Sequence, residues 1–140
     1  MKREKAYTMI EIVMVIVIVG IIAAAASANY MNSFDKAADQ EASSKLSTII
    51  AADEIYHTNS GNYHISAGPA SLSTTTAMNT TLRMQLTVTN TRNWDYMIID
   101  KTGATPPAVC AIAVRLKNGV ATGACWKLCT DSPTLEKACN

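Results

Sequence analysis

The chain has 140 residues with 12 basic and 11 acidic side chains, so its formal net charge is only +1. A nearly neutral chain lacks the electrostatic footprint of a nucleic-acid-binding protein, and we expect no specific nucleic-acid partner. The length accommodates one small domain beside a membrane helix and leaves little room for a second domain.

The N-terminal segment joins a basic leader, residues 1–6, to a long apolar run. The run covers residues 12–28 without a charge, and Glu11 stands directly before it. A run of this length spans a bilayer, and the positive leader predicts that the preceding end stays in the cytoplasm while the remainder lies outside the inner membrane. An acidic residue costs about 2.5–3.5 kcal/mol at the centre of a membrane helix. We therefore expect Glu11 to gain a partner after processing or from another chain.

The stretch Lys5-Ala6-Tyr7-Thr8-Met9-Ile10-Glu11, with its apolar continuation, resembles the class III signal of type IV pilins and type II secretion pseudopilins. The resemblance implies that a prepilin peptidase cuts between Ala6 and Tyr7 and methylates the new amine of Tyr7. It also implies that Glu11 pairs with the amine of a neighbouring Tyr7 during assembly. The family usually has Gly and Phe at the two cut positions and a proline where this chain has Ala28, so we expect no proline kink.

Two other interpretations of the N-terminal segment compete with this one. An ordinary secretory signal peptide would be cut near Ala24 or Ala26, but its apolar region would be shorter and would not open with Glu11. A simple single-pass membrane anchor is the other alternative.

A single helix is expected over residues 10–56, and its second half is amphipathic. Apolar side chains recur there at spacings of three and four: Met31, Phe34, Ala38, Ala42, Leu46, Ile49 and Ile50. This pattern predicts that one helix face lies on a core, and the resemblance implies that the core includes an antiparallel sheet. The expected fold class is α+β, with a leader at 1–6, a membrane or filament-core half-helix at 7–30 and a globular domain at 31–140.

Residues 58–82 are rich in Ser, Thr, Asn and Gly and are predicted to form a surface loop. Tyr56 and Tyr63 are expected to brace the turn where the helix ends. Residues 71–76 are a candidate for O-linked sugar, and Asn79 begins an N-glycosylation sequon, although a plain exposed loop explains both patterns better.

Strands are predicted over residues 84–89, 94–99, 108–116 and 120–126 from their alternating or apolar patterns. Residues 90–93 would form the turn between the first two. Asn118-Gly119 predicts a type I′ hairpin, because both central positions of that turn need positive φ.

The cysteines all lie in the last third of the chain: Cys110, Cys125, Cys129 and Cys139. An even number in an exported domain predicts two disulfides. Free thiols and a zinc site are the alternatives, and the zinc site is disfavoured because His57 and His64 lie far upstream.

An uninterrupted hairpin centred on Asn118-Gly119 places Cys110 opposite Lys127, and therefore diagonal to both Cys125 and Cys129. The register does not choose between these two partners. We favour Cys110–Cys125 together with Cys129–Cys139.

No catalytic motif, phosphate-binding loop or metal motif is evident, so we expect a protein that is not an enzyme and needs no cofactor. The resemblance to major pseudopilins implies calcium binding, and Asp95, Asp100 and Asp131 could supply oxygen ligands. Their spacing matches no recognisable calcium loop, and no metal ligand is assigned.

The expected function is that of a structural subunit in a type IV pilus-like filament. The resemblance implies four partners: other copies of the chain, the prepilin peptidase, an inner-membrane assembly platform with its ATPase, and the bilayer before assembly. The expected location is the bacterial inner membrane first and an extracellular pilus or periplasmic pseudopilus afterwards. A type II secretion pseudopilin and a membrane-anchored binding module remain the alternatives.

Overall fold

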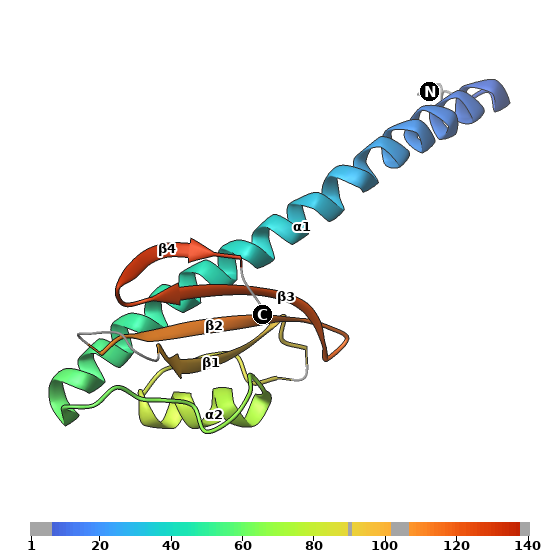
Figure 1. Cartoon of the computed structure of the whole chain (residues 1–140). Helices are drawn as coiled ribbons and strands as arrows, with labels where there is room; N and C mark the ends of the chain where they lie inside the picture. Colours follow the sequence, from blue (N-terminus) through green and yellow to red (C-terminus); the bar gives the residue numbers. More distant parts are fainter. Residues whose placement is uncertain (1–6, 90, 102–106, 138–140) are drawn as a thin grey trace, which may run out of the picture. The chain divides into compact units, whose positions relative to one another are not determined.

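The computed structural model describes residues 7–89, 91–101 and 107–137, with the backbone alone at residues 27–29 and 31. The chain divides into two compact units, residues 1–37 and 38–140. The leader, including Ala6, lies outside the described residues. Figure 1 shows the course of the chain.

The first helix, α1, covers Met9–Ser60 and is 52 residues long. Thr8 caps its start, because the Glu11 N–H lies 3.1 Å from the Thr8 carbonyl oxygen and 3.4 Å from Thr8 Oγ1. Thr8 and Glu11 have the spacing of a capping box. The helix ends where the N–H of Gly61 donates to the His57 carbonyl at 2.8 Å. The predicted long helix is confirmed, with slightly wider bounds.

Four antiparallel strands form one sheet in the order β1-β2-β3-β4. Their bounds are Trp94–Asp100, Val109–Lys117, Val120–Cys129 and Ser132–Glu136. The α+β class is therefore confirmed, and the first three strands lie close to their predicted positions. β4 was not predicted, since its five residues include Pro133, which a sheet tolerates at an edge.

The β2–β3 hairpin turns at Asn118-Gly119, whose φ angles of 54° and 77° confirm the predicted turn. It also carries a bulge that the sequence prediction did not include. Next to the turn Leu116 faces Ala121, but beyond the irregularity Val114 faces Cys125. Gly123 lies within this interval with φ of +79°, a backbone conformation that favours glycine.

Because of the bulge, the disulfide pairing differs from the predicted one. Cys110 faces Cys129 instead of Lys127, and these two cysteines are bonded to each other. The favoured pairing of Cys110 with Cys125 and Cys129 with Cys139 was therefore wrong, because it assumed a hairpin without a bulge. Cys125 is also in a disulfide, and Cys139 lies outside the described residues.

The predicted loop over residues 58–82 contains a second helix, α2, at Leu72–Thr81. Ser71 caps it, with its Oγ accepting the Thr74 N–H at 3.2 Å. Thr75 and Met78 are fully buried, and α2 packs beside β1 (Figure 1). The prediction failed because threonine favours helices weakly, so composition concealed a helix that two buried contacts and a serine cap stabilise.

The predicted strand at residues 84–89 was also wrong, because this segment has no strand pairing. The side chain of Asn79 takes the place of a neighbouring strand. Its Oδ1 accepts the Leu86 N–H at 2.8 Å and its Nδ2 donates to the Leu86 carbonyl at 2.9 Å. Leu86 is buried, and both of its backbone groups are hydrogen-bonded. The segment therefore shows an alternating burial pattern without hydrogen bonds to a neighbouring strand.

The core lies between the second half of α1, α2 and the sheet. From α1 it includes the predicted residues Ala42, Leu46, Ile49 and Ile50, all buried. Phe34 was predicted to join them, but its side chain is 57% exposed. The prediction failed because the apolar periodicity continues upstream of residue 38, where the compact unit of residues 38–140 begins.

Candidate functional site

The first half of α1 presents an apolar surface on every side. Over Met9–Ala26 the mean hydropathy is 2.8, and none of these residues is buried within the chain. Large side chains such as Ile16 and Ile21 are about two-thirds exposed, at 65% and 66%. An apolar patch of this size marks an interaction with lipid or protein, and the segment is long enough to cross a bilayer.

Polar groups gather at the start of this apolar segment. Tyr7 is 75% exposed, Thr8 caps the helix, and Glu11 lies in its exposed first turn. Within the described part of the chain, no hydrogen bond or ion pair engages the Glu11 carboxylate. A carboxylate in the first helical turn is favoured by the positive end of the helix dipole. The fold thus brings Tyr7 and Glu11 to the same helix end and leaves the carboxylate available to another group.

Sequence reasoning overlooked Thr8 as a contributor to this arrangement. The pattern of Thr8 followed three residues later by Glu11, directly before an apolar run, is a recognisable signal for a helix start. The cap places Tyr7 just outside the helix, which begins at Met9. Ala6 lies outside the described residues.

Two aromatic side chains lie next to each other further along α1. The rings of Tyr30 and Phe34 are 4.8 Å apart with an interplanar angle of 74°, an edge-to-face arrangement. Both are largely exposed, at 64% and 57%. Their apolar area adds to the surface that this half of the helix offers.

The turn after α1 is braced by aromatic rings, as predicted. Tyr63 stacks on His57 at 4.1 Å, and Tyr56 lies edge-on to His64 at 6.1 Å. Beneath them Asp53 is fully buried, with Oδ1 accepting the His64 N–H at 2.8 Å and Oδ2 lacking a hydrogen bond from the described residues. Burial raises the pKa of Asp53, an effect that the His64 N–H partly offsets.

The three aspartates considered for calcium are not assembled into a site. Asp95, at the start of β1, is held by Arg92 in a two-pronged ion pair, while Asp100 lies at the other end of the same strand. Asp131 pairs with Lys101, a hydrogen bond that lowers the pKa of this exposed carboxyl. Within residues 7–89, 91–101 and 107–137, no group of three His, Cys, Asp or Glu side chains is placed to hold a metal.

The candidate glycosylation site has a structural use. The amide nitrogen of Asn79, to which a glycan would be attached, donates to the Leu86 carbonyl. A glycan would replace one of the two hydrogens of this nitrogen at a partly buried contact, so the structure disfavours a glycan at this position.

Residues 1–27 match the family described as the prokaryotic N-terminal methylation motif. The match covers the leader, Tyr7, Glu11 and most of the apolar segment, and it confirms the prepilin-type signal that the sequence indicated. No curated protein and no solved structure matches the chain. The signal supports a protein like the type IV pilins or pseudopilins, with an inner-membrane-anchored precursor.

Proposed function

We propose that the chain is a structural subunit of a type IV pilus-like filament and polymerises through the first half of α1. The observation that carries this proposal is the exposed apolar surface of Met9–Ala26, which has Glu11 near its start and lies inside the matched methylation motif. A surface of that kind has two suitable environments, a lipid bilayer and a bundle of identical helices.

In this proposal the prepilin peptidase cuts the Ala6–Tyr7 bond at the cytoplasmic face and methylates the new amine. The subunit then stays in the bilayer through residues 7–30 until the assembly platform and its ATPase move it into the filament. Lipid tails are as apolar as the helix, so tight packing between helices drives this transfer more than exclusion of water does.

The charges at the helix start direct assembly. Glu11 is unpaired within the described residues, and cleavage creates a positively charged amine on Tyr7. Pairing of Glu11 with the Tyr7 amine of a neighbour removes the cost of a lone carboxylate in an apolar setting. The same pairing fixes how far each subunit advances along the filament axis.

Two other functions remain alternatives. A type II secretion pseudopilin would use the same processing and packing but would stay in the periplasm, and its deletion would stop protein secretion. A membrane-anchored binding module would keep residues 1–6 and would tolerate substitution of Glu11. The disulfide-rich C-terminal region suits a surface-exposed pilin somewhat better.

The intact mass of the protein in a sheared cell-surface fraction tests the proposal directly. We expect a mass that lacks residues 1–6, carries one methyl group and gains four hydrogens on reduction. Processed protein confined to the membrane fraction would favour the pseudopilin, and an unprocessed chain would refute the filament function.

Substitution of Glu11 tests the assembly step. Glu11→Ala should leave cleavage intact and strongly reduce the sheared filament fraction. Glu54→Ala, which removes an exposed carboxylate from the second half of α1, is the matched control and should assemble normally. Normal filaments from Glu11→Ala would show that the carboxylate has no part in assembly.

A further inference from the structure

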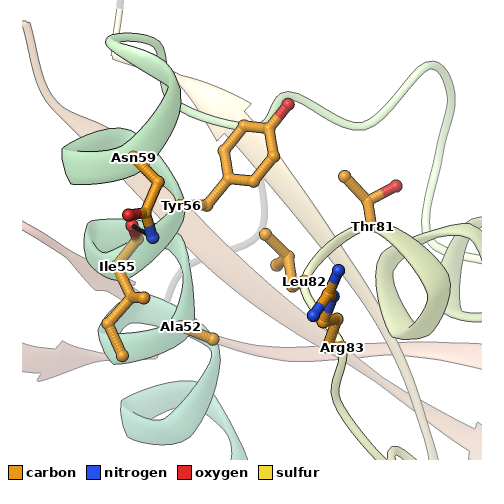
Figure 2. Close-up of a pocket in the computed structure, with 7 residues that line it drawn as sticks. All are labelled: Ala52, Ile55, Tyr56, Asn59, Thr81, Leu82 and Arg83. Carbon is orange, nitrogen blue, oxygen red and sulfur yellow. Dashed lines mark hydrogen bonds between the residues drawn. The ribbon is translucent and has the colours of Figure 1, made fainter.

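A groove runs between the second half of α1 and residues 81–86, entirely within the unit of residues 38–140. It consists of two adjoining hollows that share Ala52, Ile55, Leu82 and Arg83, the larger with a volume of about 480 Å³. Figure 2 shows the larger hollow, with residues of α1 along one side and the segment that follows α2 along the other. We call it the α1 groove.

The wall formed by residues 82–86 is held in place before any partner binds. The Leu82 N–H donates to the Met78 carbonyl at 2.8 Å, and both backbone groups of Leu86 are bound by Asn79. Arg83, between these fixed points, has φ of 52°. Glycine usually fills such a left-handed position after a helix, and strained positions cluster at functional sites. The arginine side chain is therefore a candidate for a binding role.

The chemistry of the groove is apolar with a positive rim. Ile55, which lines both hollows, is 64% exposed. Arg83 lines both hollows and Lys45 lines the second, and no acidic side chain lines either. Neither cation has an ion-pair partner in the described part of the chain. Such a groove suits an apolar group that also attracts cations, as an aromatic ring does through its face.

The chain itself carries a group of this kind. Tyr30 and Phe34 form an exposed aromatic pair, and Asp35, directly after Phe34, adds an acidic residue to the segment. Phe34 and Ile55 both belong to α1, and a helix cannot bring residues 21 positions apart into contact. The two surfaces can meet only between different copies of the chain.

We propose that the α1 groove of one subunit binds the Tyr30–Phe34 pair of a neighbouring subunit. This inference rests on the proposed filament function and identifies a second contact beyond the apolar helix ends. Ile55 and Leu82 would receive the rings, and Arg83 with Lys45 would lie over the ring faces and near Asp35. The contact would also explain why an arginine occupies a position that favours glycine.

A photo-crosslinker at position 34 tests which surface the aromatic pair contacts. Full-length subunits carrying Phe34→p-benzoylphenylalanine would be assembled from mixed light and heavy nitrogen isotopes and irradiated as filaments. We expect crosslinks from residue 34 to residues 52–59 or 82–86 of another copy, identified by their mixed isotope masses. Val120→p-benzoylphenylalanine, at an apolar side chain that is 69% exposed on the β2–β3 hairpin, is the control and should not reach the groove.

Arg83→Gly gives an independent test, because it separates folding from assembly. The glycine fits the left-handed backbone, so the thermal unfolding midpoint should be unchanged or higher, whereas the sheared filament fraction should fall several-fold. Lys117→Ala, which removes an exposed cation at the end of β2, should leave the filament fraction unchanged.

The outcomes separate this inference from the proposed function. Filaments in which residue 34 crosslinks only outside the groove, or in which Arg83→Gly assembles normally, would overturn the inference and leave the filament function intact. A wild-type chain that forms no filament under any condition would overturn both.

Discussion

The indole of Trp126 on β3 donates to the carboxylate of Asp39 on α1, with 3.1 Å between Nε1 and Oδ1. The two residues are 87 positions apart in the chain. Trp94 on β1 makes a parallel contact, since its Nε1 lies 3.0 Å from the Ala38 carbonyl oxygen. Two strands thus bind adjacent residues of α1 at the point where the compact unit of residues 38–140 begins.

Replacement of Trp126 by phenylalanine tests the contribution of this bond. Phe keeps most of the ring contact but leaves Asp39 without its donor, and a hydrogen bond to a charged group contributes about 1.5–3 kcal/mol. We expect the free energy of unfolding to fall by an amount in this range, measured on the full chain in detergent by denaturant titration. In an Asp39→Ala background the same replacement should cost much less, and equal costs in the two backgrounds would contradict a specific bond.

Asn79 is expected to be the most sensitive asparagine among the described residues. Asn79→Ala leaves the N–H and the carbonyl of buried Leu86 unpaired, and each unsatisfied group costs about 1–3 kcal/mol. Thermal unfolding should therefore shift to a clearly lower temperature. Asn59→Ala removes a single exposed bond to the Ile55 carbonyl and should have little effect. Similar shifts for the two variants would show that the Leu86 segment finds other partners.

The structure was predicted most accurately from the sequence where one strong local signal determines it. The uncharged run before residue 28, the Asn118-Gly119 turn and the apolar faces of Leu46 and Ile49 each follow from local composition and periodicity. The match over residues 1–27 confirms the prepilin-type signal for the same reason, because its pattern is contiguous.

The predictions failed where a tertiary contact replaced a local signal. The side-chain amide of Asn79 binds the backbone of Leu86 as a neighbouring strand would, so the segment of residues 84–89 needs no strand partner. The burial of Met78 stabilises α2, a helix of poor intrinsic propensity. The bulge at Gly123 shifts the register by two residues, so that Cys110 faces Cys129 instead of Lys127. The α1 groove combines segments far apart in the sequence, and no local pattern indicates it.

The Cys110–Cys129 bridge should be the main covalent stabiliser of the β2–β3 hairpin. It closes a loop with a sequence separation of 19, for which the chain-entropy model gives about 3 kcal/mol. The double variant Cys110→Ala/Cys129→Ala should lose about that much unfolding free energy. Peptide mapping without reduction should recover residues 110 and 129 in one linked pair. A linked pair of Cys110 with Cys125 would contradict the bulged register.

By elimination, the prediction of two disulfides leaves Cys125 and Cys139 as the second pair. Mapping should then recover a second linked peptide that contains both residues. Reduction of the whole protein should add four hydrogens, and an addition of two would limit the protein to one bridge.

The buried Asp53 should make stability depend on pH. Burial raises its pKa in the folded state above the ordinary 3.8, so the folded protein keeps the proton to higher pH than the unfolded chain does. The stability that this group contributes is full below about pH 3.8 and is lost as the pH rises through the folded pKa.

Asp53→Asn keeps an oxygen for the His64 N–H but cannot ionise. Its unfolding free energy relative to the wild type should therefore increase between pH 4 and pH 7. A difference that stays constant across this pH range would show that the carboxyl does not change its charge on folding.

Gly123 and Gly20 should respond in opposite ways to the same substitution. Neither has a heavy atom within 4 Å of an added Cβ, so no neighbouring side chain or segment blocks alanine at either position. Gly123 has φ of +79° in the bulge, where an L-residue costs about 1–2 kcal/mol. Gly20 lies inside α1, where alanine is favoured over glycine by about 1 kcal/mol. Gly123→Ala should therefore lower the unfolding temperature of the full chain in detergent, whereas Gly20→Ala should not. Because residues 7–30 pack in the proposed filament, Gly20→Ala also reports on assembly. Normal folding with fewer sheared filaments would place Gly20 at a close helix–helix contact. Normal filaments would show that the glycine is merely tolerated.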